Sequence, residues 1–334
     1  MIKYIIIFLS TINFLMAKCM HCKDVCKCSQ ETKHGGHSRA DMPLPIGLMG
    51  DHMGHEGQWM ATVKRMDMRM SGIYNKSNLI DVSDVHKNYM MAPLSMTNNM
   101  TMIGFMKPSK SHTWMLMFNH HDKEMLMQHR NGTKPMTVSK GMGDIALSYH
   151  HATKSSAQRK SFWSMGLSIP NGKTDEKFKN VTLPYGMQLG SGTWDFKPSF
   201  TSKVYNDNHS FGYRVSAILR NGENDDNYTL GNRYEANIWY AMNRTKRFSP
   251  SLRLNYVDQG SIDGANTLLN MMMSPMNVTT NYGYKRLSLA IGFNAVFDAT
   301  SSLAVEYQLP LHQSFDGISL GLDSMIVIAY RHLF

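Results

Sequence analysis

The sequence has no long apolar segment after its first residues, and it contains few charged residues. No window beyond residue 17 reaches the ~18 consecutive apolar residues of a membrane-spanning helix, so the chain does not cross a bilayer with helices. Charged residues make up 18% of the 334 residues, with 35 basic against 25 acidic side chains spread along the chain. Because no basic cluster is interleaved with aromatic residues, we predict no nucleic-acid partner.

The sequence also lacks the short motifs that mark common enzymes. It contains no G-x-S-x-G, no H-E-x-x-H, no glycine-rich phosphate loop and no dinucleotide fingerprint. Only a hydrolytic site assembled from distant strands would leave no local motif of this kind. We therefore predict that the protein is not an enzyme and has no catalytic residues.

The first 17 residues have the layout of a secretory signal peptide. Lys3 precedes an apolar stretch from Tyr4 to Ile12, and the segment ends at Ala17. This stretch is shorter than the ~20 residues that span a bilayer, which argues against an uncleaved anchor. We predict cleavage after Ala17 and export of the remaining chain.

An alternation of apolar and polar residues runs through most of the exported chain. In one segment, Trp194, Phe196 and Phe200 alternate with Asp195 and Lys197. This period of two places apolar residues on one face of a β-strand and polar residues on the other. About twelve such segments follow one another, separated by turn sequences such as Asn-Gly and Asp-Gly, and no helical period intervenes. The pattern predicts an all-β chain with antiparallel strands.

Segment length favours a transmembrane barrel over a soluble sandwich. Most segments are about 9 to 13 residues long, close to the ~9–11 of transmembrane strands and longer than the ~5–6 of sandwich strands. Their polar faces suit a water-filled lumen. The chain ends on Phe334, and a terminal aromatic on an amphipathic last strand is typical of outer-membrane barrels, so we expect the barrel-assembly machinery to contact it. We predict a transmembrane antiparallel β-barrel of about 12 strands, with 10 to 14 strands left open.

These patterns divide the chain into three parts. Residues 1–17 form the signal peptide, residues 18–56 form a short irregular periplasmic leader rich in Cys, His and Met, and residues 57–334 form the barrel. We expect the barrel to lie in the lipid of a Gram-negative outer membrane.

Three parts of the sequence resemble a known family. These are the opening Arg39–Met53 with Gln58–Met60, the dipeptide Gly143-Asp144, and the middle motif Leu183–Asp195. They are similar to the outer-membrane transporter-like proteins named for phenol meta-pathway degradation, and the resemblance covers about residues 39–334. It implies an outer-membrane barrel with a role in uptake or export. It identifies neither the solute nor any catalytic residue.

All four cysteines lie in the leader, at Cys19, Cys22, Cys26 and Cys28. Their crowded spacing differs from the separated pairs of zinc ribbons and suits a soft ion such as Cu(I). In an oxidising compartment the same cysteines can instead form two disulfides, and the sequence leaves both interpretations open. The further candidate metal ligands of the leader are His34, His37, His52, Met53 and His55.

Methionine is unusually frequent, with 30 residues. Methionines alternate, and so share one strand face, in four groups: Met66, Met68 and Met70; Met100 and Met102; Met115 and Met117; Met125 and Met127. Facing inward, they would form a ladder of weak Cu(I) or Ag(I) sites. Facing outward, they would be ordinary lipid-contacting side chains. The sequence leaves both orientations open.

The functional prediction is an outer-membrane barrel for passage or binding of a small solute, with a soft metal ion such as copper handled by the leader and the methionines. Two alternatives remain. One is a conduit for hydrophobic or aromatic compounds without metal binding, with methionine as an adaptable apolar lining. The other is a structural or adhesion barrel.

Overall fold

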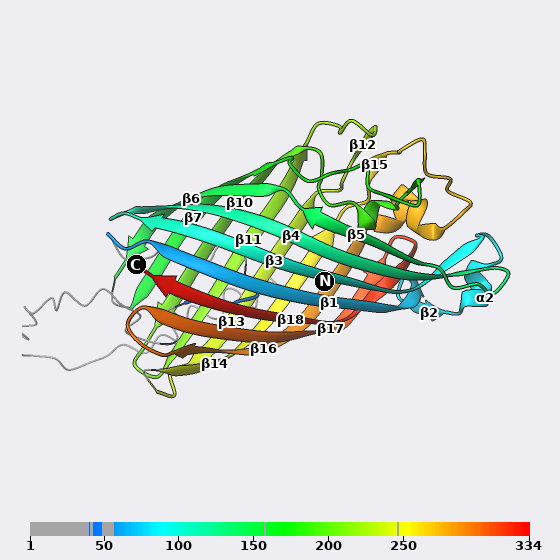
Figure 1. The fold of residues 1–334 in the computed structure, drawn as a ribbon. Helices are drawn as coiled ribbons and strands as arrows, with labels where there is room; N and C mark the ends of the chain where they lie inside the picture. Colours follow the sequence, from blue (N-terminus) through cyan, green and yellow to red (C-terminus); the bar gives the residue numbers. More distant parts are fainter. Residues whose placement is uncertain (1–39, 41–42, 49–56, 157, 246) are drawn as a thin grey trace, which may run out of the picture. The chain divides into compact units, whose positions relative to one another are not determined.

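The computed structural model describes residues 40, 43–48, 57–156, 158–245 and 247–334. In this part of the chain, twelve long antiparallel strands form a closed barrel (Figure 1). The first and last strands close it, with Met60 opposite Leu333 and Asn75 opposite Ile318. The result confirms the predicted fold and strand number. The barrel strands are β1 (Met60–Asn75), β3 (Met91–Pro108), β4 (His112–His129), β6 (Ile145–Ser155), β7 (Arg159–Ile169), β10 (Trp194–Tyr205), β11 (His209–Asn221), β13 (Arg233–Met242), β14 (Phe248–Gln259), β16 (Tyr284–Val296), β17 (Ser301–Phe315) and β18 (Ile318–Leu333).

The two ends of the barrel differ. Short turns join the strands at the end where β1 begins and β18 finishes, which we call the short-turn end. Most connections at the opposite, long-loop end are longer and carry small elements of their own (Figure 1). These are β2 (Asn78–Ile80), α2 (Val82–Val85), β5 (Met136–Met142), β8 (Lys177–Phe178), β9 (Val181–Thr182), η2 (Tyr185–Met187), β12 (Tyr228–Thr229), β15 (Asp263–Gly264), η3 (Pro275–Asn277) and η4 (Thr279–Tyr282).

Side chains alternate between the outside and the inside of the barrel wall. On β10, Trp194 and Phe196 are 50% and 39% exposed on the outside, whereas Asp195 between them is fully buried on the inside. The final strand follows the same rule, with Ile326, Ile328 and Tyr330 outside. An apolar exterior around a polar interior is the arrangement of a barrel in a bilayer, because the lipid-facing side must be apolar. None of the helices in the described residues is long and apolar enough to cross a membrane.

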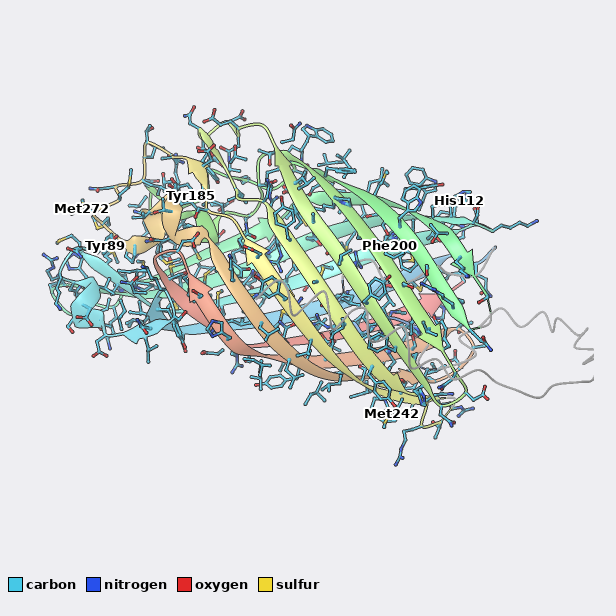
Figure 2. The ribbon with its side chains drawn as sticks, turned by 180° about the vertical axis from the view of Figure 1, so that it is seen from behind. Tyr89, His112, Tyr185, Phe200, Met242 and Met272 are labelled. Atoms are coloured by element: carbon cyan, nitrogen blue, oxygen red, sulfur yellow. The ribbon has the colours of Figure 1, made fainter. Side chains whose placement is uncertain are left out.

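Aromatic side chains gather on the outside near the short-turn end. The ring centroid of Tyr149 lies 5.0 Å from that of Trp114 and 5.6 Å from that of Trp163, on three neighbouring strands. His112 and Met242 mark the same end in Figure 2, opposite Tyr89, Tyr185 and Met272. Amphipathic rings of this kind belong at the membrane interface.

A glycine makes room for the buried side chain of Trp239 inside the barrel. Gly212 of β11 lies opposite Trp239 of β13, and both side-chain positions face the lumen. A Cβ atom at residue 212 would overlap the Cζ2 and Cε2 atoms of the buried indole. The barrel therefore accommodates Trp239 because residue 212 has no side chain.

We predict that Gly212→Ala lowers the free energy of unfolding by about 1–3 kcal/mol, the usual cost of overpacking a core. The measurement is the urea midpoint of the barrel refolded into lipid vesicles. Gly104→Ala is the matched control, because a Cβ there has its nearest neighbouring atom, the Leu116 oxygen, at 3.8 Å. Equal midpoints for the two variants would contradict the prediction.

Candidate functional site in the barrel lumen

Residues 43–48, which we call the inner segment, lie inside the barrel. Leu44 and Leu48 form a buried cluster with Phe162 of β7 and Trp239 of β13. On another side, Ile46 packs against Ala304 of β17 and against Val327 and Ala329 of β18. The inner segment thus contacts strands from different parts of the wall and fills part of the lumen between them.

Two lysines that point into the lumen hold the backbone of the inner segment. Lys64 of β1 donates hydrogen bonds from Nζ to the carbonyl oxygens of Ile46, at 3.0 Å, and Leu48, at 3.4 Å. Lys203 of β10 donates to the carbonyl oxygen of Pro43 at 3.2 Å. Buried ammonium groups need such partners, because an unpaired charge in this environment is costly. The inner segment and the two lysines therefore stabilise each other.

One wall of the lumen carries a network of charged and amide side chains. Arg253 of β14 is fully buried and pairs with Glu306 of β17, at 2.5 Å from Nη2 to Oε1. The same guanidinium donates to the Oδ1 atom of Asn237 at 2.5 Å and to the Oε1 atom of Gln308 at 2.9 Å. Gly47 of the inner segment lies directly against this ion pair, where a Cβ atom would collide with both partners.

The lumen-facing sides of the neighbouring strands β1, β3 and β4 form a second wall, which is rich in methionine. Met60, Met102 and Met106 are buried on the lumen side, and Met66 packs against the cluster that contains Ile46. All four alternating groups of methionine singled out in the sequence occupy the inward face, since they alternate with outward residues of the same strands. The structure thus favours the inward orientation. The inward methionines of these strands include Met60, Met66, Met68, Met70, Met96, Met100, Met102, Met106, Met115, Met117, Met125 and Met127.

A polar cavity of about 370 Å³ lies in the long-loop half of the lumen. Lys197 in its wall donates to the Ser168 hydroxyl at 2.9 Å, and Arg220 pairs with the buried Asp195. We call this cavity the outer chamber. Its lining includes both signs of charge and several amide, hydroxyl and backbone groups, so it suits a hydrated solute.

The loop 183–191 lies over the outer chamber and belongs to the middle motif Leu183–Asp195. Hydrogen bonds connect it to the barrel wall. Asp144, from the Gly143-Asp144 dipeptide, accepts hydrogen bonds from the backbone N–H of Ser191 at 2.9 Å and from its hydroxyl at 2.8 Å. Lys123 of β4 donates to the carbonyl oxygens of Gly186 at 3.1 Å and Gln188 at 2.5 Å. Two motifs far apart in the sequence therefore meet at this loop.

A tyrosine from another loop completes the cover. The Tyr282 hydroxyl accepts the Gly186 N–H at 3.0 Å and donates to the Met276 carbonyl oxygen at 2.8 Å. Burial raises the pKa of Tyr282, so the hydroxyl keeps its proton and its donor role at neutral pH. Hydrophobic contacts of Leu183, Met187 and Met276 extend the cover across the long-loop end.

The candidate metal ligands of the leader are not placed by the structure. Cys19, Cys22, Cys26, Cys28, His34, His37, His52, Met53 and His55 all lie outside the described residues, as do the predicted signal peptide and its cleavage site. Within the described ranges, no three His, Cys, Asp or Glu side chains come together as a metal site. Leader binding of metal and the predicted domain boundaries remain predictions.

The sequence patterns did not predict the inner segment or the lysines that hold it. The only available signal was the family-like opening motif, which includes residues 43–48. Lys64 and Lys203 stand on the polar faces of their strands, where they resemble any lumen-facing charge. Their partners could not be predicted, because those partners are backbone atoms remote in the sequence.

Solved structures of other outer-membrane proteins align with this chain. An outer-membrane channel from Pseudomonas putida F1 aligns with a TM-score of 0.64 at 12% identity, over 86% of this chain and 99% of that one. The TodX monoaromatic hydrocarbon channel aligns with a TM-score of 0.44 at 7% identity, over 84% and 90%. The KdgM porin aligns with a TM-score of 0.40 at 8% identity, over 81% and 98%. No family model matches the chain, and no curated protein matches it in sequence.

The first of these likenesses, together with the closed wall and apolar exterior, defines the chain as a twelve-stranded barrel of the outer-membrane type. Membership of the family named for phenol meta-pathway degradation stays a prediction.

We predict that the double variant Lys64→Met/Lys203→Met conducts more ions than the wild type. The inner segment would lose three charge-assisted hydrogen bonds, each worth about 1.5–3 kcal/mol, while the side chains keep similar length. Single-channel recording in planar bilayers measures the effect. The matched control is Lys140→Met/Lys285→Met, because these lysines are 61% and 64% exposed. An unchanged conductance in the first variant would show that the lysines do not hold the inner segment in the lumen.

Proposed function

We propose that the protein is an outer-membrane barrel for the passage of a small solute, and that this solute is a soft metal ion, Cu(I) above all. The observation that carries the proposal is the methionine wall of β1, β3 and β4. Thioether sulfurs are soft, uncharged ligands that select Cu(I) over hard cations. A lumen lined with them can bind such an ion weakly enough to release it, as conduction requires.

The orientation of the barrel follows from its two ends. Barrels of this type turn their short connections to the periplasm and their long loops outward. The outer chamber then faces the external medium, and the inward methionines extend from Met96 and Met125 at the long-loop end to Met60 and Met106 at the periplasmic end. A solute entering under the loop 183–191 would meet polar groups first and thioethers later.

The leader adds a second part to the proposal. Its four cysteines, with His34, His37, His52, Met53 and His55, would capture copper on the periplasmic side. Thiolates bind Cu(I) more tightly than thioethers do, so affinity would differ between leader and lumen. This difference would give transfer between them a preferred direction.

A conduit for hydrophobic or aromatic compounds is the second candidate. It is favoured by the apolar character of the same wall, because flexible methionines adapt to irregular apolar ligands. The two candidates separate on sulfur chemistry: a soft ion requires the thioether, whereas an organic solute requires only an apolar surface.

We predict that replacing Met66, Met68, Met100 and Met325 by Leu slows Cu(I) entry into proteoliposomes about tenfold, by removing about 1.4 kcal/mol of stabilisation on the path. These residues are neighbours across three strands, with Met66 opposite Met100 and Met68 opposite Met325. Leucine keeps the volume and apolarity, so folding should persist. A chelator dye inside the vesicles reports Cu(I), and a neutral aromatic solute is followed in parallel.

The control replaces Met165 and Met242 by Leu, because both methionines lie on the lipid side. Unchanged Cu(I) entry, together with undiminished passage of the aromatic solute by both the wild type and the four-leucine variant, would favour the organic conduit. A barrel that passes neither solute and shows no conductance would favour the structural or adhesion role.

We predict that the mature protein binds Cu(I) tightly under reducing conditions, and that replacing Cys19, Cys22, Cys26 and Cys28 by Ser removes this binding. Thiolates are the strongest Cu(I) ligands in the chain, and serine preserves their size without the sulfur. Titration against a competing Cu(I) chelator measures the difference. Equal, weak binding by the two proteins would instead indicate that the cysteines serve as a disulfide staple.

A further inference from the structure

A small cavity of about 20 Å³ interrupts the methionine wall near the short-turn end. Four thioether side chains surround it, two from β3 and two from β4. We call it the methionine pocket. Its lining consists of Thr62, Lys64, Met102, Gly104, Met106, Met115 and Met117.

The pocket exists because Gly104 stands in the middle of the methionine wall. Gly104 faces the lumen between Met102 and Met106, and in the register it lies opposite Thr62 on one side and Met117 on the other. A Cβ atom at residue 104 would meet no atom closer than 3.8 Å. Because glycine has no side chain, the inward row of β3 leaves an empty space between Met102 and Met106.

The surrounding methionines are held in place. Met106 lies directly opposite Met115 across the two strands, and the pair is packed with Met60 and Leu333 in one buried cluster. Met117 packs against this cluster, and Met102 is 1% exposed. Packing therefore limits the positions that the thioethers can reach.

The chemistry of the lining suits an ion better than a water molecule. The cavity has room for one water-sized particle, but a bound water needs two to four polar partners. The Thr62 hydroxyl is the one neutral polar side chain of the lining. The Lys64 ammonium also lines the cavity, and its hydrogen bonds to the carbonyl oxygens of Ile46 and Leu48 offset part of the positive charge that an incoming cation would meet. Thioethers, in contrast, are good ligands for soft monovalent cations.

We propose that the methionine pocket binds one soft monovalent cation, Cu(I) or Ag(I), through the sulfur atoms of Met102, Met106, Met115 and Met117. This inference rests on the proposed function and gives it a defined site. Because the ligands are uncharged, the ion exchanges readily, as a station on a path requires.

The test is an Ag(I) titration of the full mature chain in detergent micelles, with methyl-¹³C methionine and with the four leader cysteines replaced by Ser. The cysteines are removed because thiolates would take the ion first. We expect Ag(I) to shift the methyl resonances of Met102, Met106, Met115 and Met117 together. The lipid-facing Met165 and Met242 should keep their resonances, and single Met→Leu variants assign the signals.

Two variants sharpen the result. Replacing the four pocket methionines by Leu should weaken Ag(I) binding at least about tenfold, a loss of the size seen when metal-site partners are removed. The matched control replaces Met96, Met125 and Met127 by Leu, since these are equally buried methionines in the core at the long-loop end. Gly104→Val keeps every thioether but fills the space, and it should also weaken binding.

The possible results distinguish a failure of the methionine pocket from a failure of the proposed function. Shifts confined to other lumen methionines, or undiminished binding by the four-leucine and Gly104→Val variants, would overturn the pocket while leaving passage of a soft ion in place. Resonances that stay unchanged at every lumen methionine would overturn both.

Discussion

Backbone hydrogen bonding governs the whole architecture. Inside a bilayer no water is available to the peptide groups, so a sheet can cross only when every strand has two neighbours. Pairing of β1 with β18 along almost their full length meets this condition. Once the wall is closed, the alternation of side chains follows, because one face of every strand must meet lipid and the other the lumen. The apolar exterior and the polar interior are consequences of the same closure.

Closure of the wall confines charged side chains in the lumen, and the inner segment provides partners for some of them. Charged side chains on the inward face lie in a confined space and need partners, because an unpaired buried charge is strongly unfavourable. Arg253 and Glu306 satisfy each other within the wall. Lys64 and Lys203 instead use carbonyl groups of residues 43–48. The inner segment, which fills part of the lumen, therefore also supplies the carbonyl acceptors that stabilise these buried lysines.

The sequence predicted the parts of this structure that depend on local alternation. The alternating segment that contains Trp194, Phe196 and Phe200 corresponds closely to β10. On β3 and β4, strands of 18 residues each, the predicted alternation covers only the part nearest the short-turn end, residues 100–107 and 112–121. Beyond the apolar belt both faces of these strands are polar or carry methionine, as at Asn98 and Asn99, so the alternation disappears while the pairing continues. Loop 183–191 and the inner segment depend on contacts between distant residues, which no local pattern encodes.

Burial of apolar surface explains part of the methionine wall. At the long-loop end, Met96 and Met125 belong to a core that loops cover, so burial of apolar surface accounts for them. The residues around Gly104 differ, because they leave a cavity that a larger side chain at residue 104 would fill. Well-packed cores avoid such space and use methionine sparingly, since its flexibility specifies a structure poorly. Four methionines around an unfilled position fit the proposed soft-ion site, for which the thioether is the property that matters.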